Sequence, residues 1–590
     1  MSSSQFILAY ACERKEEMSA EELAIRWNAA TRHLEDVAAT SLEFSRAGDG
    51  RTGFAVWQHA RKVMTWPMFA ERGGEAAGWL HVPAAAGRPE DGVDAVELAR
   101  GLSTGAIDRV TMGAPAAAVH WSEDGLRIVN DRLGMVRLYE IVVPGFGMVW
   151  SSRPGLAHIF AGLQPALSQS TWNDMATLGW PSHGTAHLGN GGQMPASTSV
   201  HAGADGTTSS QCDRDEWIRS IIEDGVPSLA EGGLGMVDSL STAAWWEGRP
   251  VADLSGGKDS RVTAAAAIRA GVVDTVRTVN TDTGEVEAAR RLLALAGDPV
   301  RHRVDSVVEP KKPEGSAMDR YISMQRAWEG AYNARSAYRS RPFTGFRPAS
   351  APRINGLGGE AVQGRTLLNP AWEKKMTDQG AEVGRERLTQ MVRSGGGGVG
   401  GEVIEDSVAS TLRLADQSGE VGLQSAFNVV DFFYHFSKMP YWSMPQATGS
   451  TLLPFYAPQM LPRTMWAIPN AMTEYGRLHR DVLRELMPQW ADEPFYKGSA
   501  RTRATPWMWE NADWEGIEPL IMEGAAALET FSLQEIENFM GKVRDGGGNG
   551  RHETAFARVL WEMSFREYAD EIGRQAAATS REVERVRTGN

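Results

Sequence analysis

Residues 255–260 of this 590-residue chain read SGGKDS and could bind phosphate groups. The two glycines would let backbone N–H groups approach an anion closely, because glycine carries no side chain. Ser255 and Ser260 could add hydroxyl hydrogen bonds, and a helix beginning here would add the partial positive charge of its N-terminus. The GxxxxGK[ST] pattern of the Walker loop is absent, so the predicted phosphate site is of another type.

Asp259 lies inside this loop, where a carboxylate would repel bound phosphates unless a cation came between them. Mg²⁺ is a hard ion that prefers oxygen ligands and bridges protein carboxylates to phosphates. The loop therefore predicts a nucleotide held together with Mg²⁺.

The segments around the loop alternate between strand and helix patterns. Residues 251–254 and 275–281 are predicted strands, and the second is rich in β-branched side chains. Residues 262–270 and 286–296 are predicted helices, each followed by a glycine that can end it. Strand, helix, strand and helix in succession predict a parallel sheet with right-handed crossovers.

The N-terminal third of the chain has a different pattern. Short apolar runs separated by glycine-containing turns predict strands at 6–11, 117–121, 126–130 and 141–143. Residues 202–210, rich in Gly, Ser and Thr, are expected to be a linker, and the chain from about residue 425 is mostly helical in pattern.

Two glycine-rich runs, 394–401 and 545–550, are expected to be flexible surface loops. For the first run a second interpretation is a lid near the active site, since mobile loops can gate catalysis.

Composition limits the classes of function. The length suggests two domains, and 42% hydrophobic with 23% charged residues is typical of a soluble globular protein. A net charge of −14 disfavours nucleic-acid binding, and the lack of an apolar run of about 18 residues disfavours a membrane span. Cys12 and Cys212 form no metal-binding or disulfide pattern, so a reducing cytoplasm is expected.

SGGKDS resembles the PP-loop of ATP pyrophosphatases, and the chain is similar more narrowly to the asparagine synthetase B superfamily. The supporting segments are NDRLG at 130–134, GLGGE at 356–360, PFYAP at 454–458 and PFYK at 494–497. The resemblance implies an α/β protein with two domains. Residues 1–205 would form a degenerate, Ntn-type, glutaminase-like α+β domain without a catalytic cysteine. Residues 211–590 would form an ATP-binding synthetase domain, with a parallel sheet of the adenine nucleotide alpha hydrolase type and a helical C-terminal part.

The same resemblance assigns roles to individual residues. Asp259 and Glu360 would be the two Mg²⁺ carboxylates, with Glu360 in place of the usual Asp. Lys497 would stabilise the charge that develops between the carboxylate and the α-phosphate. The implied nucleotide contacts are Leu254, Ser255, Gly256, Gly257, Lys258, Asp259, Ser260 and Gly356.

Three departures from the family narrow the expected function. The chain begins Met-Ser-Ser-Ser and not with the cysteine nucleophile of a glutaminase, so the amine is expected to come from the substrate. Leu357 stands where asparagine synthetases have Glu and β-lactam synthetases have a catalytic Tyr, and leucine does no acid–base chemistry. SGGKDSR, with Lys258 and Arg261, is most similar to the loop of lasso peptide cyclases.

The resulting expectation is an ATP-dependent ligase that closes a macrolactam on a ribosomal precursor peptide. An Asp or Glu side chain would be adenylated, and the N-terminal amine of the core peptide would attack it, with a leader peptidase and a leader-binding protein as possible partners. The alternatives are a small-molecule amide or β-lactam synthetase and a non-catalytic peptide-binding scaffold. No general base is identified, and His302, His435 and His479 are candidates that are more often structural.

Overall fold

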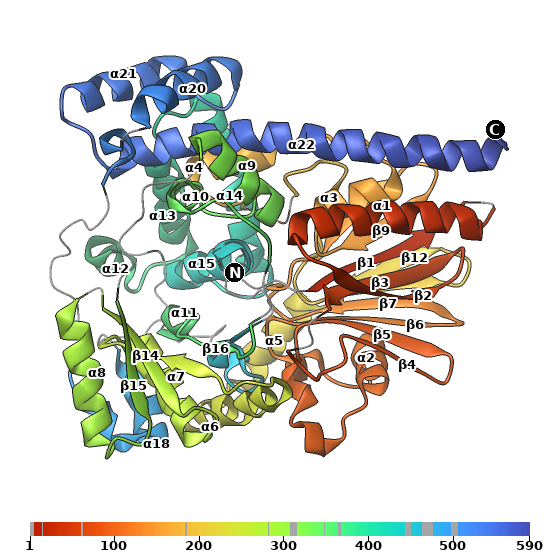
Figure 1. Ribbon diagram of the computed structural model, residues 1–590. Helices are drawn as coiled ribbons and strands as arrows, with labels where there is room; N and C mark the ends of the chain where they lie inside the picture. The colour runs from red at the N-terminus through yellow and green to blue at the C-terminus, as the bar shows by residue number, and fades with distance from the viewer. Residues whose placement is uncertain are drawn as a thin grey trace.

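A computed structural model of the chain gives the positions of most residues. The described residues are 5–14, 16–60, 63–182, 184, 186–280, 282–306, 315–346, 349–363, 367, 369–442, 450–462, 476–496, 506–511 and 513–589. They form a mixed α/β protein with two antiparallel sheets, one parallel sheet and many helices (Figure 1).

The two antiparallel sheets have six strands each. The first has the order β10-β8-β9-β1-β3-β2, and its strands are β1 Gln5–Cys12, β2 Leu42–Gly48, β3 Thr52–His59, β8 Tyr139–Val143, β9 Gly147–Ser151 and β10 Gly191–Gln193. The second has the order β12-β11-β7-β6-β5-β4, and its strands are β4 Phe69–Arg72, β5 Glu75–Leu80, β6 Ala117–Ser122, β7 Gly125–Asn130, β11 Thr198–Gly203 and β12 Thr208–Cys212.

Strand β1 shows that the first sheet is covered on both faces, by the second sheet on one side and by helices on the other. All eight of its residues are buried, because side chains of alternating direction meet a different partner on each face. Ile7 and its alternate neighbours pack against the second sheet, whereas Leu8 and its neighbours pack under helices. Those helices are α1 Ala20–Ala38, α3 Pro154–Ala161 and α22 Gly550–Thr588, while α2 Ala95–Thr104 packs against strands of the second sheet (Figure 1).

The parallel sheet has five strands in the order β15-β14-β13-β16-β17. Their bounds are β13 Val251–Asp253, β14 Thr275–Asn280, β15 Arg301–Ser306, β16 Arg353–Ile354 and β17 Thr451–Leu452. The chain runs outward from β13 through β14 to β15 and then returns to β16 on the other side of β13. In such sheets ligands bind outside the carboxyl ends of the two strands where the order reverses.

The helices around this sheet include α6 Leu229–Ser239, α7 Lys258–Arg269, α8 Thr283–Leu295 and α18 Arg477–Leu486. Four consecutive alanines of α7, residues 264–267, are fully buried. Their small side chains let the helix pack close to the sheet core, which fixes where its N-terminus lies.

The remaining helices of the described chain lie mainly in its second half. They are α4 Gln169–Thr177, α5 Arg214–Asp224, α9 Ala317–Trp328, α10 Ala334–Arg339, α11 Gly359–Gln363, α12 Pro370–Met376, α13 Ala381–Gly395, α14 Gly401–Glu420, α15 Ala426–Phe433, α19 Pro488–Ala491, α20 Trp514–Ala527 and α21 Leu533–Arg544. A π-helical turn, Tyr434–Lys438, continues α15. The 39-residue α22 contacts both α1 and α3 over the sandwich and α9 and α10 of the helical region (Figure 1).

Most of the predicted elements are confirmed. The four N-terminal strands and the strands and helices near 251–296 are present, although the first of these helices begins at Lys258 and not at residue 262. The described residues after 425 are mostly helical, and they also include the two-residue strand β17. Residues 545–549 form a largely exposed connection between α21 and α22, and Gly550 begins α22.

The linker prediction for residues 202–210 is wrong. These residues belong to the hairpin of β11 and β12, which adds two strands to the second sheet. The polar run is tolerated because β12 is an edge strand whose outward side chains meet solvent. The division into domains at 205 and 211 remains a prediction.

The glycine-rich run 394–401 is neither an exposed loop nor a lid over the phosphate loop. Residues 396–399 are buried against α21 and α22, where a side chain on Gly398 would meet Ile536. The backbone N–H of Gly398 donates to Glu535, and the Gly395 carbonyl accepts from Arg558. Glycine occurs here because helices approach the backbone closely.

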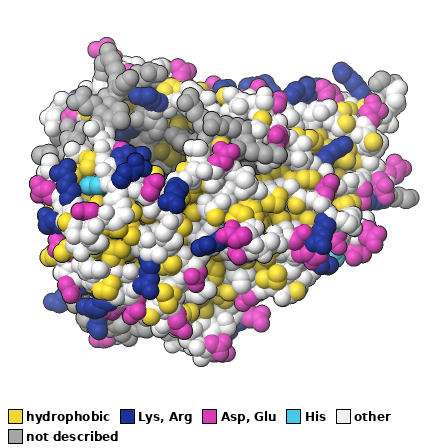
Figure 2. Space-filling view, turned by 60° about the horizontal axis from the view of Figure 1, so that its bottom comes forward, with side chains coloured by type: hydrophobic (Ala, Val, Ile, Leu, Met, Phe, Trp, Pro, Cys, Tyr) yellow, Lys and Arg dark blue, Asp and Glu magenta, His cyan; other side chains and the backbone are white. Residues whose placement is uncertain are grey.

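Acidic and basic side chains are interspersed over the face shown in Figure 2, and the net charge of the whole chain is −14. No helix of the described part is both long enough and apolar enough to cross a bilayer.

Candidate active site

Two loops meet where the strand order of the parallel sheet reverses. One follows β13 and leads into α7, and the other follows β16 and leads into α11. A side chain on Gly356 would come within 2.6 Å of the Ser260 backbone nitrogen, and one on Gly359 within 2.4 Å of the Asp259 Oδ1. The loops are therefore in direct contact, and glycine is required at both positions because no Cβ atom fits.

Internal hydrogen bonds give the first loop its shape. The hydroxyl groups of Ser255 and Ser260 lie 2.8 Å apart, and the Ser255 N–H donates to the Ser260 Oγ at 3.2 Å. The Gly257 N–H donates to the Ser255 Oγ at 3.1 Å. A tight turn results at the N-terminus of α7, which is the local geometry that anion-binding loops use.

Asp259 is the central charged group of the site. Its Oδ1 lies 2.8 Å from Lys258 Nζ and 2.7 Å from His479 Nε2. Burial acts to raise the pKa of Asp259, but His479 and Lys258 outweigh it and lower that pKa to about 2. The carboxylate is thus ionised at neutral pH and a third of its side-chain surface is exposed, so it can bind a cation.

Glu360 is the second residue of α11 and directly follows Gly359, the glycine that lies against Asp259. The Tyr434 hydroxyl donates to Glu360 Oε1 at 2.6 Å and fixes the direction of that carboxylate. Burial and the nearby Glu360 charge raise the pKa of Tyr434, so the phenol remains a protonated donor.

Lys438 lies one turn after Tyr434, at the end of the π-helical turn. Its Nζ lies 5.3 Å from the Trp180 ring centroid, 5.4 Å from that of Tyr434 and 5.6 Å from that of Trp442. Burial lowers the pKa of Lys438, while the charge of Glu360 acts in the opposite direction. The Lys438 ammonium group is therefore surrounded by aromatic rings and lies near Glu360.

The segment before Lys497 is fastened to the phosphate loop. The Tyr496 N–H donates to the Gly256 carbonyl at 2.8 Å, and a side chain on Gly256 would collide with the Tyr496 Cβ. The fully buried Arg261 donates from Nη2 to the Gly256 and Pro494 carbonyls, both at 3.0 Å. Lys497 itself lies outside the described residues.

Leu254 differs from the other predicted nucleotide contacts because its side chain does not lie in the loop. Its side chain is buried in the core of the parallel-sheet region, its N–H donates to the Arg277 carbonyl, and its carbonyl accepts from Thr278. Leu254 therefore supports the loop from below, and its role as a nucleotide contact remains a prediction. Residues 255–260 and Gly356 do converge in one place, as the sequence predicts.

The three candidate histidines lie in different places. His302 contacts the Thr278 hydroxyl in the sheet, and His435 contacts the Asp431 carbonyl within its own helical segment. His479 is the one that reaches the phosphate loop, 220 residues along the chain from Asp259. No sequence motif marks the contact of His479 with Asp259 or the positions of Tyr434 and Lys438, whereas Tyr496 belongs to the PFYK segment at 494–497.

The NDRLG motif of the N-terminal region serves a structural purpose. Asp131 is fully buried and accepts backbone N–H groups from Ala116, Leu133, Met135 and Val136. All four hydrogen bonds to this carboxylate come from the backbone, and they hold the turn that follows β7 in the sandwich.

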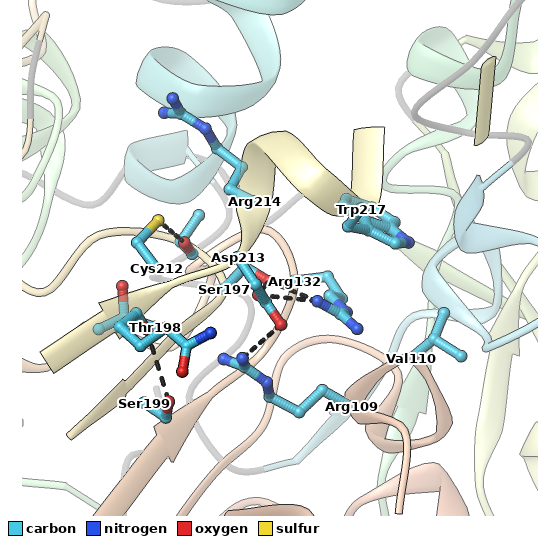
Figure 3. A network of polar contacts seen from close by, with 12 residues as sticks. Arg109, Val110, Arg132, Ser197, Thr198, Ser199, Cys212, Asp213, Arg214 and Trp217 are labelled. Atoms are coloured by element: carbon cyan, nitrogen blue, oxygen red, sulfur yellow. Dashed lines mark hydrogen bonds and ion pairs between the residues drawn. The ribbon is translucent and has the colours of Figure 1, made fainter. Parts of the chain in front are cut away.

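Next to it, Arg132 joins the sandwich to α5 (Figure 3). Its guanidinium lies 2.8 Å from Asp213 Oδ1, and Arg109 lies 2.5 Å from Asp213 Oδ2. The Ser197 hydroxyl donates to the same Asp213.

A scan against protein-family models finds no match for the chain, and a search of curated proteins finds no significant relative. Four of the short segments that carry the resemblance nevertheless come together in space, namely 255–260, 356–360, 454–458 and 494–496. The active-site hypothesis depends on this convergence.

Proposed function

We propose that this protein is an ATP-dependent, AMP-forming ligase of the lasso peptide cyclase type. The observation that carries the proposal is the contact between the loops 255–260 and 356–360 at the strand-order reversal. A glycine-rich turn, a helix N-terminus and an ionised carboxylate meet there, which suits a nucleotide bound with a divalent cation.

Asp259 and Glu360 are the residues that would hold Mg²⁺. The fit is chemical: both are carboxylates, the pKa of Asp259 is held low, and Gly359 brings the Glu360 loop onto the Asp259 side chain. Within the described residues no cluster of three or more His, Cys, Asp and Glu side chains could hold a metal. Two carboxylates are enough for Mg²⁺, which commonly takes one or two protein carboxylates and completes its shell with phosphates and water. When bound, the ion would neutralise charge on the phosphates.

The reaction we propose has two steps. A carboxylate oxygen of an Asp or Glu side chain attacks the α-phosphorus of ATP, and the bond to pyrophosphate breaks. The N-terminal amine of the core peptide then attacks the acyl carbon, the bond to AMP breaks, and the amine loses one proton. The products are an amide, AMP and pyrophosphate. The contribution of the protein is positioning and electrostatic stabilisation.

Two observations favour a peptide as the substrate. Leu357 is buried in an apolar cluster, so the loop presents no acid or base there for small-molecule chemistry of the β-lactam synthetase kind. Trp442 is 46% exposed beside Lys438, and exposed aromatic side chains are suited to peptide contacts. A leader peptidase and a leader-binding protein would be the accompanying partners.

The test uses the full chain with ATP, MgCl₂ and a leader-free core peptide encoded beside its gene. We expect AMP, pyrophosphate and a peptide lighter by one water. If the acid side chain carries ¹⁸O, mass spectrometry should find one ¹⁸O in AMP, because the activated oxygen leaves with the α-phosphate. Formation of ADP and phosphate would contradict adenylation, and failure to bind ATP in calorimetry would favour the scaffold alternative.

A further inference from the structure

A cavity of about 310 Å³ lies between the antiparallel sandwich and the helical region, apart from the phosphate loop. Its walls come from residues 133–139 and 193–196 on one side and from α14 and the π-helical turn on the other. Cavities of this volume are at the lower end of ligand-binding pockets and would hold a molecule about the size of an amino acid.

Arg137 is the distinctive group in this cavity. It is 5% exposed, and among the described residues it has no carboxylate within ion-pair distance. Within the described part of the chain, its Nη1 and Nη2 have only long hydrogen bonds, 3.5 Å to the Tyr139 hydroxyl and 3.3 Å to the Pro440 carbonyl, and its Nε has no partner. A guanidinium carries five donors, so this one is buried with most of its bonding capacity unused. Burial of such a charge is costly unless an anion compensates it.

The surrounding groups hold Arg137 in place without neutralising it. Its guanidinium carbon lies 4.7 Å from the centroid of the Tyr441 ring, a stacking contact that orients the planar group. His187 also lines the cavity, with its Nε2 buried and without a partner. Burial and the charge of Arg137 lower the pKa of His187 to about 3, so this ring is neutral and adds no counter-charge.

The second cation of the cavity, Arg214, is already paired. Its side chain points away from the Asp213 network (Figure 3), contacts Asp215 at 2.7 Å and donates to Gln417 of α14 at 3.0 Å. No Asp or Glu is among the described residues that line the cavity. The wall is thus positive and partly aromatic, with one cation that lacks an acidic partner.

We infer that this cavity binds a small carboxylate, with Arg137 as the anchor that receives it in a two-oxygen contact. A carboxylate is favoured over phosphate because a single unpaired guanidinium matches one negative charge and the aromatic wall suits an organic body. The inference is independent of the proposed ligase activity. Phe436 and Ser437 line the cavity from the same π-helical turn whose Tyr434 contacts Glu360, so a ligand here would touch an element of the active site.

The experiment measures binding of benzoate and benzamide to the full-length protein by calorimetry in a buffer free of other carboxylates. The two probes have the same shape, and only benzoate is charged. We expect one benzoate per chain and at least a tenfold weaker affinity for benzamide. Arg137→Met should weaken benzoate binding at least tenfold, whereas Arg127→Met on β7, outside the cavity, should leave it unchanged.

Thermal unfolding provides a second readout. Without ligand, Arg137→Met should melt at the same temperature as the parent or higher, because it removes an unpaired buried charge. Benzoate should raise the melting temperature of the parent and of Arg127→Met only. A lower melting temperature of Arg137→Met together with unchanged benzoate affinity would show that Arg137 is a structural residue.

Other outcomes would also overturn the inference. These are equal binding of benzoate and benzamide, tighter binding of inorganic phosphate than of benzoate, or no binding of benzoate, acetate or glutamate up to about 10 mM. If Arg137→Met fails to fold, Arg137→Lys keeps the charge but lacks the planar fork. It should lose most of the benzoate affinity, and parent-like affinity in that variant would contradict the two-oxygen contact.

Discussion

Two aspartates, Asp131 in the antiparallel sandwich and Asp259 in the parallel-sheet region, are held in opposite ways. Asp131 in the sandwich accepts four backbone N–H groups and is fully buried. Asp259 in the parallel-sheet region is bonded by the side chains of Lys258 and His479 and keeps a third of its side-chain surface exposed. Both belong to short polar motifs that stand out in the sequence.

The type of hydrogen-bond donor distinguishes a structural acid from an acid that can bind a ligand. Backbone donors cannot move without unfolding the turn that carries them, so Asp131 is committed to the fold. Side-chain donors can rotate away when a cation or phosphate arrives, so Asp259 can exchange its partners. We therefore expect substitutions in the first region to change stability and substitutions in the second to change activity.

The largest effect is expected for Asp259→Asn, which removes the charge from the phosphate loop. AMP formation should fall roughly 10³-fold, because the variant loses a carboxylate that is proposed to hold Mg²⁺ beside the phosphates. The free energy of unfolding should change by about 1 kcal/mol or less, since the group is partly exposed. Asp253→Asn is the control: this acid ends β13 and pairs with Arg277, and its loss should leave turnover within about twofold. Equal loss of activity in both variants would contradict the role of Asp259.

Asp131→Ala should have the second largest effect, and this effect should be on the free energy of unfolding and not on activity. Four buried N–H groups would lose their acceptor, so urea denaturation should show a loss of about 3 kcal/mol in the free energy of unfolding. Activity per folded molecule should be retained below the unfolding transition. Asp124→Ala, in the exposed turn between β6 and β7, is expected to cost less than about 0.5 kcal/mol. A large loss of activity in Asp131→Ala without a loss of stability would contradict a purely structural role of Asp131.

The elements with a strong local pattern could be predicted from the sequence. β1 is an apolar run, β14 is rich in β-branched residues, and α7 follows a glycine-containing loop, so each expresses its state locally. The error at 202–210 arose because composition suggested a linker, whereas pairing of β12 with β11 decided the structure. β16 and β17 have two residues each, too few to produce any periodicity, and their places in the sheet depend on long-range pairing.

The candidate site could be predicted only in part. Residues 255–260 and 356–360 carry recognisable motifs, and their meeting follows from the strand order, which a single sequence does not reveal. Tyr434 and His479 join the site from distant helices and have no motif of their own. Arg137 could not be identified either, because the packing of the described residues around it, which includes no acidic side chain, leaves no local trace in the sequence.

Gly356→Ala tests the contact between the two loops. The new methyl group would overlap the Ser260 backbone, so the loops must separate. AMP formation should then fall about 100-fold, because the two carboxylates proposed to hold Mg²⁺ would move apart. Gly541→Ala in α21 is the matched control, since a Cβ there meets nothing within 4 Å. That variant should keep its activity and gain about 0.5–1 kcal/mol of stability. Full activity in Gly356→Ala would show that the close approach is not needed for turnover.

Tyr434→Phe is expected to have the smallest effect. It tests whether the function of the candidate site depends on the orientation of the Glu360 carboxylate. The ring and its packing remain, and only the hydrogen bond to Glu360 Oε1 is lost. The carboxylate can then rotate, so the Mg²⁺ concentration for half-maximal AMP formation should rise and turnover should fall about tenfold. Tyr338→Phe is the control, because Tyr338 is equally buried and donates to Asp513 outside the site. Each variant should lose about 1 kcal/mol of stability. A change in Mg²⁺ dependence confined to Tyr434→Phe would show that the phenol orients Glu360, whereas identical kinetics in both variants would assign Tyr434 to packing alone.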